Sequence, residues 1–513
     1  MANKNKSNDN SSKGFLAGVE RVGNALPHPA MIFVIMIAIL AVISALAAKS
    51  NVTVNYYDAK AEENVELAAV SLLNADGIRY MINSVVENFT SFAPLGTVLV
   101  AMLGVGVAEY AGFFDTGLKK LLSNVPSVLL TAAVVFAGII SNIASDAGYV
   151  VVVPLGAMIF ASAGKHPIAG LAAAFAGVSG GFSANLIFGP TDALLAGITN
   201  EALRASKISA TVDVTGNWYF LIVSTFILTI VGTLVTEKIV IPNLGEYKGS
   251  YVHDDKPITD LEKKALRNSI IAILIFVVIL ILAMAPQNAI LKEADKSGDI
   301  NIQHFLGNGL IFAILLLFLI PGVVYGKTVG KINSSNDLVE AMSQAMKSMS
   351  GFLVLAFFAA QFVSFFAYTN LGTVLSVKGA EFLEAIGLTG IPLIILFIIL
   401  SAFINLFIGS ASAKWAIMAP IFVPMFFKMG LSPELTQMAY RIADSSTNII
   451  SPLMNYFAMI VIFMQKYDKD RGLGTLISTM LPYSMAFLLL WSVLLIIWMA
   501  FGIPLGPGAP LTV

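Results

Sequence analysis

Residues 432–465 read SPELTQMAYRIADSSTNIISPLMNYFAMIVIFMQ, and this stretch decides the fold. It is an apolar segment with few charges, and it exceeds the roughly 20 residues that cross a hydrocarbon core as one helix. In its middle, SSTN at residues 445–448 and then Pro452 favour helix ends rather than helix interiors. Such residues at membrane depth predict a helix that stops and restarts, which is typical of transporters.

A second segment, residues 167–200, has the same length and the same kind of interruption. SGG at residues 179–181 and GPT at residues 189–191 break it. Residues in and before the two segments match at one constant offset of 266 positions: Pro154 with Pro420, Gly164 with Gly430, Pro167 with Pro433, Ser179 with Ser445, and the aromatic residues Tyr149 with Trp415. Several matches at one offset predict an internal repeat, formed by residues 91–240 and 350–501.

The composition places most of the chain in lipid. Of 513 residues, 57% are hydrophobic and 12% are charged, and this charged fraction is about half that of a typical soluble domain. The net charge of −1 argues against nucleic acid as a partner, the absence of cysteine excludes disulfides, and the four histidines form no metal-binding motif. We expect a protein that is not an enzyme and that carries no cofactor.

Charge counting assigns the topology. We predict that residues 126–163 and 390–428 are re-entrant hairpins, which leaves nine full spans. With the N-terminal tail, residues 1–28, in the cytoplasm and the C-terminus outside, 19 lysines and arginines lie inside and 9 lie outside, in agreement with the positive-inside rule. The two hairpins then enter the membrane from opposite sides, so the two repeats are inverted.

The predicted fold is therefore an all-α polytopic membrane protein of a bacterial inner membrane. It has nine transmembrane helices and two re-entrant helical hairpins, arranged in two inverted repeats. Each repeat contains one hairpin and one broken helix, at residues 167–200 or 432–465. The spans at residues 29–48 and within 268–325 lie outside the repeats, and we expect them to form a scaffold or a dimer contact.

Charged side chains at membrane depth are the first candidates for function: Glu109, Asp146, Asp192, Lys414, Arg441 and Asp444. Each costs about 2.5–3.5 kcal/mol at the bilayer centre unless it has a partner or water. Arg441 and Asp444 share a helix face, so they are either an internal ion pair or parts of a binding site. Structural alternatives exist for the others: a brace for Lys414, a helix cap for Asp192 and a snorkelling side chain for Glu109.

Both hairpin turns are rich in small polar residues. The first turn contains Ser141, Asn142, Ser145 and Asp146, and the second runs from Asn405 to GSAS at residues 409–412. Asn and Ser oxygens together with freed carbonyl groups suit Na⁺, and half-helix N-termini attract anions. The turns predict transport of a carboxylate-bearing solute with an ion, and Asn142, Ser145 and Asp146 form a candidate second ion site.

Three motifs carry a family resemblance: ERVGNALPHP at residues 20–29, GSASAKWA at 409–416 and YRIADS at 440–445. Along nearly its whole length the chain resembles the AbgT family of aminobenzoyl-glutamate transporters. The resemblance implies a homodimer whose subunits have nine spans and two hairpins. It also implies a Na⁺ site at Asn405, Gly409 and Asp444, and a solute site lined by Asp192, Ser412, Trp415, Pro433, Arg441 and Pro452.

From this resemblance we expect a secondary active transporter in the lipid membrane, with p-aminobenzoyl-glutamate or a related aromatic carboxylate or antimetabolite as its solute. Coupling to Na⁺ or H⁺ would drive elevator-type alternating access. A Na⁺-coupled dicarboxylate transporter and a proton-driven exporter of sulfonamide-like drugs are the alternatives. An intramembrane enzyme is disfavoured because no histidine lies at membrane depth, and a channel would show much faster, uncoupled flux.

Overall fold

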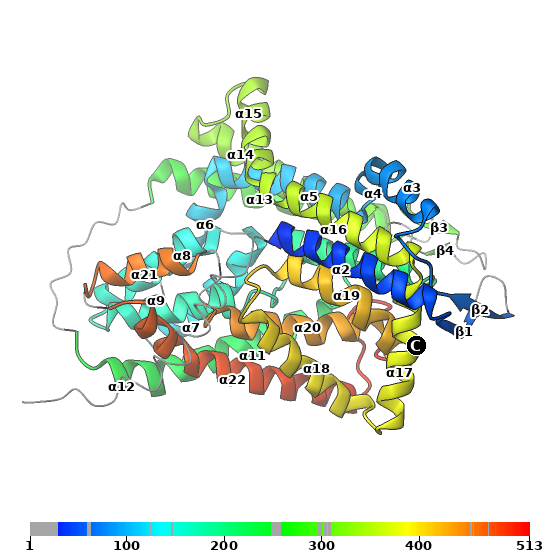
Figure 1. The fold of residues 1–513 in the computed structure, drawn as a ribbon. Coiled ribbons are helices and arrows are strands. Elements are labelled where there is room, and N and C mark those ends of the chain that lie inside the picture. Colours follow the sequence, from blue (N-terminus) through cyan, green and yellow to red (C-terminus); the bar gives the residue numbers. More distant parts are fainter. Residues whose placement is uncertain are drawn as a thin grey trace, which may run out of the picture.

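The computed structural model is almost entirely helical, and most of its long helices run roughly side by side (Figure 1). It describes residues 29–58, 63–122, 125–126, 128–144, 147–247, 258–286, 288–294, 300–301, 305, 309–451, 454, 456–469 and 471–513. The predicted cytoplasmic tail, residues 1–28, lies outside the described residues.

Long apolar helices form the body of the molecule. They are α2 (Pro29–Lys49), α11 (Trp218–Val235) continued by η3 (Thr236–Val240) and α12 (Ile241–Leu244), α13 (Asp260–Met284), α14 (Leu310–Val329), α16 (Ser350–Tyr368) and α22 (Leu473–Ala500). Within the described residues, 6 helices are each long and apolar enough to cross a membrane. They coincide with six of the nine predicted spans. Leu282 and Leu489 on these helices are exposed, as lipid-facing residues are.

Two further apolar helix pairs are bent. α5 (Ala93–Ala111) turns by 65° into α6 (Phe113–Leu122), and α17 (Leu371–Ala385) turns by 118° into the first arm of the second hairpin. α5 corresponds to the predicted span at residues 91–112. The other predicted spans are the two broken helices, whose pieces are each too short to cross a bilayer alone. The total of nine spans and the inverted relation of the repeats therefore stay predictions.

Each segment predicted to be a re-entrant hairpin forms two helices joined by a short turn, and the two helix pairs lie toward opposite ends of the long helices (Figure 1). Their re-entry into the membrane stays a prediction. The first consists of α7 (Leu130–Ile140), the short turn η1 (Ser141–Ala144) and α8 (Ala147–Ser162). The second consists of α18 (Gly390–Asn405) and α19 (Ala411–Lys428). At 1.5 Å per residue the arms are about 16–27 Å long. Since the hydrocarbon core is roughly 30 Å thick, each hairpin can turn within the membrane.

Both long polar-interrupted segments break where the sequence predicts. In the first, α9 (Pro167–Phe175) and the turn η2 (Ala176–Gly180) are separated by an irregular stretch from α10 (Pro190–Ala205). In the second, α20 (Pro433–Asn448) ends well before α21 (Phe457–Gln465) begins. Proline stands at the start of α9, α10 and α20, where its missing N–H interrupts no intrahelical hydrogen bond.

Small residues allow the first hairpin to pack tightly against α9. A Cβ atom at Gly170 would lie 2.2 Å from the carbonyl oxygen of Gly156 in α8. Membrane helices approach this closely where small residues face each other. The buried cluster around this contact continues through the second hairpin, α20 and α22. The hairpins and broken helices thus share one core.

A second packed unit contains α5, α13, α14 and α15 (Ser335–Ser348), which lie together along the upper edge of the bundle (Figure 1). Its buried side chains form two further clusters, one of which also contains Ala193 of α10. A Cβ atom at Gly104 of α5 would lie 2.2 Å from the carbonyl oxygen of Leu315 in α14. No helix was predicted over Ser335–Ser348 from the sequence, because α15 is a polar helix that begins with a Ser334–Asp337 capping box.

Shorter elements gather at one end of the molecule (Figure 1). They are the antiparallel strands β1 (Thr53–Asp58) and β2 (Glu63–Ala68), the helices α3 (Ala75–Asn83) and α4 (Val85–Thr90), and the small strands β3 (Glu293–Ala294) and β4 (Ile300–Asn301). All of them fall between predicted membrane spans. The fold prediction left these segments as loops.

The residues after α22 fold back onto the starts of two distant helices. The N–H of Phe220 in α11 donates to the carbonyl oxygen of Leu505 at 3.2 Å, and the N–H of Ser432, which precedes α20, donates to that of Leu511 at 3.0 Å. Residues 502–513 therefore connect the beginnings of α11 and α20, which belong to different predicted repeats.

Candidate functional site

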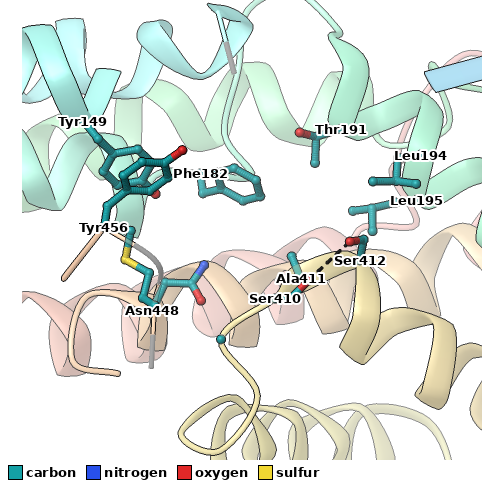
Figure 2. A pocket seen from close by; sticks show the side chains of 12 residues that line it. Tyr149, Phe182, Thr191, Leu194, Leu195, Ser410, Ala411, Ser412, Asn448 and Tyr456 are labelled. Carbon is teal, nitrogen blue, oxygen red and sulfur yellow. Dashed lines mark hydrogen bonds between the residues drawn. The ribbon is translucent and has the colours of Figure 1, made fainter. Parts of the chain in front are cut away.

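A cavity of about 200 Å³ lies where the second hairpin turn faces the breaks of the two long helices. Hydroxyl groups, backbone and rings share its lining: Tyr149, Phe182, Thr191, Leu194, Leu195, Gly409, Ser410, Ala411, Ser412, Asn448, Met454 and Tyr456 (Figure 2). Both hairpins and both broken helices contribute residues. The cavity is smaller than the roughly 300–1,000 Å³ of typical small-molecule sites, so a drug-sized solute requires some displacement of its walls.

Aromatic rings form one side of the cavity. Tyr149 of α8 and Tyr456, which precedes α21, stack with ring centroids 4.5 Å apart and an angle of 12° between their planes. Phe182, from the break of the first long helix, points toward the same side (Figure 2). From the sequence, Tyr149 was identified only as the repeat partner of Trp415, and Tyr456 was not identified as a candidate. A tyrosine four residues after Pro452 is a weak signal, because it has no distinguishing spacing.

Polar groups and two helix N-termini form the opposite side. Ser410 Oγ and Ser412 Oγ lie 3.4 Å apart, and Ser410 Oγ accepts the N–H of Ala413, which caps the start of α19 (Figure 2). Thr191, in the first turn of α10, faces the same space. Free N–H groups and the helix dipole attract anions at a helix start. The cavity therefore offers hydroxyl and amide donors to a carboxylate and ring faces to an aromatic group.

A buried ion pair joins the two broken helices beside this cavity. Arg441 Nη2 of α20 lies 2.6 Å from Asp192 Oδ1 of α10, and the two side chains are 3% and 2% exposed. Asp192 Oδ2 also accepts the N–H of Gly189 at 2.7 Å, so the predicted capping role of Asp192 is confirmed. Arg441 Nε has no hydrogen-bond partner among the described residues, which leaves it a donor for a further ligand.

A second buried ion pair joins the second hairpin to α20. Lys414 Nζ lies 2.7 Å from Asp444 Oδ1 and donates to the side-chain oxygen of Asn405. Of the two interpretations left open above, an internal ion pair between Arg441 and Asp444 is therefore wrong. The two residues are near each other along α20, but each side chain reaches a different neighbouring element. Lys414 is the brace that the sequence left as an alternative, although its acceptors are side chains.

The remaining residues of the predicted solute site lie away from the cavity lining or outside the description. Trp415 is fully buried: its ring stacks on Tyr440 at 4.4 Å, and its Nε1–H donates to Thr199 Oγ1 at 3.0 Å. Pro433 starts α20, about 12 Å along the helix axis from Arg441 at 1.5 Å per residue. Pro452 lies outside the described residues. Of the predicted set, Ser412 lines the cavity, and Asp192 is adjacent to a lining residue.

The predicted Na⁺ ligands are close together, but their oxygens are engaged. Asn405 Oδ1 and Asp444 Oδ1 both accept from Lys414, and Asp444 Oδ2 accepts from Asn448 Nδ2 at 3.2 Å. Gly409 lines the cavity. In this arrangement Lys414 supplies the positive charge that the sequence assigned to Na⁺, so the residues do not fit a bound Na⁺ while Lys414 stays in place.

Of the three residues of the candidate second ion site, the structure describes Asn142. Asn142 Nδ2 donates to the carbonyl oxygens of Ile139 and Gly181, at 3.0 and 3.4 Å. Its buried Oδ1 has no hydrogen-bond partner among the described residues. Ser145 and Asp146 lie outside the described residues. Glu109 is exposed on α5, as expected for a snorkelling side chain.

Comparisons with known proteins agree with this architecture. The sequence profile of the AbgT transporter family matches residues 14–513. The p-aminobenzoyl-glutamate transport protein of Escherichia coli (strain K12) is 38% identical over 499 residues, which is 97% of each chain.

Two solved structures share the fold. The YdaH transporter of Alcanivorax borkumensis is 44% identical with a TM-score of 0.86, over 94% of this chain and 100% of that one. MtrF of Neisseria gonorrhoeae, which is assigned to a class of antimetabolite efflux pumps, is 46% identical with a TM-score of 0.90, over 97% and 100%. Since profile, sequence and fold agree over nearly its whole length, the chain belongs to the AbgT family of transporters.

Proposed function

We propose that this chain moves p-aminobenzoyl-glutamate, or related aromatic carboxylate and sulfonamide-like antimetabolite solutes, across a bacterial inner membrane by secondary active transport. The observation that supports this proposal most is the two-sided cavity between the hairpins. Stacked tyrosines offer an aromatic surface, while serines and the starts of α10 and α19 offer donors to a carboxylate. An aromatic ring linked to a carboxylate is complementary to both sides.

The proposed unit of movement is the pair of hairpins with the two broken helices. Their side chains share one buried cluster, whereas α5, α13, α14 and α15 pack mainly in two further clusters, which the first unit enters through Ala193 of α10. Elevator-type movement of the first unit against the second would expose the cavity alternately on the two sides. We further propose a homodimer with cytoplasmic N-termini and external C-termini.

Na⁺ is the proposed coupling ion, with Asn405, Gly409 and Asp444 as its ligands and with H⁺ as the alternative. The proposed solute ligands are Ser412 at the cavity, Asp192 and Arg441 beside it, and Trp415, Pro433 and Pro452 when the walls move. A second ion at Asn142, Ser145 and Asp146 is supported by the buried, unpartnered Oδ1 of Asn142 among the described residues.

Flux measurements in proteoliposomes test the function. Labelled p-aminobenzoyl-glutamate is loaded inside or outside, and Na⁺ and H⁺ gradients are imposed one at a time. We expect accumulation against the solute gradient with one cation and in one direction, which also separates uptake from efflux. A labelled sulfonamide and a labelled aliphatic dicarboxylate serve as competing substrates. Flux that equals that of empty liposomes under every gradient, for all three solutes, contradicts the proposal.

A further inference from the structure

The cation at the proposed Na⁺ site is a side chain of the protein. Lys414 Nζ donates to Asn405 Oδ1 and to Asp444 Oδ1, and the Lys414 side chain is 0% exposed. The ring of Tyr440 lies 5.1 Å from the same nitrogen. An ammonium group has three N–H donors and no acceptor. Two oxygens and one aromatic face therefore enclose it completely.

The oxygen of Asn405 is held in position for a cation. Asn405 Nδ2 donates to Asp444 O, Thr447 Oγ1 and Asn448 Oδ1, each at 2.8 Å. These bonds fix the amide so that its oxygen turns toward Lys414. An amide in the first hairpin turn differs, because Asn142 Oδ1 has no partner among the described residues. A resident ammonium thus distinguishes the second hairpin from the first.

A second cation cannot be added to this cluster without cost. Asp444 is the one carboxylate that contacts Lys414 among the described residues, and the neighbouring carboxylate of Asp192 is already paired with Arg441. Burying an uncompensated charge in a low-dielectric interior is strongly unfavourable. The Lys414 ammonium and a Na⁺ ion therefore exclude each other from the oxygens of Asn405 and Asp444.

We propose that Lys414 is a tethered competitor of Na⁺, so that the ion binds Asn405 and Asp444 only after the lysine amine has left them. This inference rests on the proposed Na⁺ coupling, but it concerns binding and not flux. Lys414 lies near the start of α19, while Asn405 ends α18 and Asp444 lies on α20. Movement of α19 relative to these two helices withdraws the amine, which links the hairpin position to ion binding.

Thermal unfolding of the purified full-length chain in detergent tests the competition, with NaCl titrated against KCl at constant ionic strength. Lys414→Met removes the ammonium and keeps an unbranched apolar side chain that is one atom shorter. In KCl this variant is expected to unfold at a lower temperature than wild type, since Asp444 is left without its partner. In NaCl we expect the unfolding temperature of Lys414→Met to recover. The Na⁺ concentration that gives half of this stabilisation should be lower than in wild type by about tenfold or more, because a site blocked by a competitor has a reduced apparent affinity.

Three matched variants make the result specific. Lys414→Arg keeps a cation and is expected to keep the wild-type Na⁺ response. Lys428→Met removes another lysine of α19 and should leave the Na⁺ midpoint unchanged. Adding Asn405→Ala to Lys414→Met should abolish the increase in apparent Na⁺ affinity. This result would distinguish Na⁺ binding at Asn405 from Na⁺ binding at Asn142.

The inference is overturned by a Lys414→Met protein whose Na⁺ midpoint equals that of wild type, or which K⁺ stabilises equally well. If Lys414→Met is recovered from membranes only in NaCl, that recovery supports the proposal; equal loss in NaCl and KCl contradicts it. If the wild type shows no flux of p-aminobenzoyl-glutamate, the proposed function is refuted, but the Na⁺ titration can still be interpreted.

Discussion

Arg441 pairs with Asp192 and still has hydrogen-bonding capacity for a solute. A guanidinium group carries five N–H donors in a planar fork. Asp192 contacts Nη2, and Nε has no hydrogen-bond partner among the described residues. One arginine can therefore join α20 to α10 and bind a solute carboxylate with its other donors.

For this reason we expect Arg441→Lys to impair solute binding although it conserves the charge. Lysine can neutralise Asp192, but it lacks the second, directed donor. A lost charge-assisted hydrogen bond costs about 1.5–3 kcal/mol, so the Kd for p-aminobenzoyl-glutamate should rise roughly tenfold to a hundredfold. Equilibrium binding of the labelled solute measures this. Arg471→Lys, at a partly buried pair with Asp468, is the control, and an unchanged Kd in Arg441→Lys would refute the binding of the solute carboxylate by the guanidinium group.

The aromatic partner of the solute can be identified by a second comparison. Tyr456 lines the cavity, whereas Trp415 is buried against Tyr440. We expect Tyr456→Leu to raise the solute Kd about threefold to tenfold, since an aromatic pair contributes roughly 0.5–1.5 kcal/mol beyond its area. Trp415→Phe should change it less. The same binding assay decides; a larger effect at Trp415 would instead support the place of Trp415 in the solute site that the resemblance implies, and would mean that the cavity walls rearrange around the solute.

Most of the charged residues near the site were identified from the sequence, but their pairing was not. Lipid makes an intramembrane charge conspicuous, so Asp192, Lys414, Arg441 and Asp444 stand out in the chain. Which acid meets which base depends on how the second hairpin sits against α20, and no local pattern encodes that. Tyr456 was missed because a single tyrosine after a helix break has no distinguishing spacing.

Among the helices, the contact between α8 and α9 depends on the absence of side chains. A Cβ atom at Gly170 would lie 2.2 Å from the Gly156 carbonyl oxygen. Gly170→Ala is therefore expected to lower stability by about 1–3 kcal/mol through overpacking. The melting temperature in detergent measures the effect. Gly474→Ala in α22, where a Cβ atom meets nothing within 4 Å, is the matched control, and equal melting temperatures for the two variants would disprove the close contact.

The start of α9 carries a pH-sensitive cap. His166, between the first hairpin and α9, accepts the N–H of Ile168 through Nδ1 at 3.2 Å, which requires the neutral ring. Burial lowers the pKa of His166; the charge of Arg471 lowers it further, and Asp468 opposes this. The ring of Tyr247 packs against it. The folded protein thus binds the proton less well than the unfolded chain, so this contribution is fully present above the unfolded pKa of about 6.5 and is lost below it.

We therefore expect the melting temperature to fall between about pH 7.5 and about pH 5.5, with roughly 1 kcal/mol attributable to this cap. His166→Asn supplies a cap that does not titrate, so the variant should lose less stability over the same range. Thermal unfolding of both proteins at several pH values checks this. Identical pH profiles would show that His166 does not contribute.

Element positions followed from the sequence wherever lipid imposed a clear pattern. The hairpins and both helix breaks were predicted because Gly, Pro and short polar residues are conspicuous in apolar segments. By contrast, α15 and the strands β1 and β2 lie in polar segments, where the hydrophobic pattern carries little information. The capping box of α15 was present in the sequence, but a short polar helix is marginal without its packing against α5.

At the scale of the whole molecule, the contact between α10 and α5 is the place to test relative movement. Ala193 of α10 belongs to the same buried cluster as Ala101 of α5. The chain has no native cysteine, so cysteines at these two positions can be cross-linked with reagents of graded length. We expect short cross-links to abolish p-aminobenzoyl-glutamate flux and longer ones to restore part of it.

The control pair lies within one packed unit. Ala111 of α5 and Ala265 of α13 share a separate buried cluster, and joining them should leave transport unchanged. The readout is proteoliposome flux before and after reductive release of the cross-linker. Full flux with Ala101 and Ala193 joined by the shortest reagent would exclude elevator-type movement between these units.

The segment after α22 has a consequence for how the molecule is made in the cell. During translation α11 reaches the membrane long before residues 502–513 leave the ribosome, yet Phe220 and Ser432 hydrogen-bond to Leu505 and Leu511 of that segment. The starts of α11 and α20 can therefore be fastened together only once α22 has been synthesised. Nascent chains that stall before this point expose both helix starts, and membrane quality-control proteases would meet them in that open form.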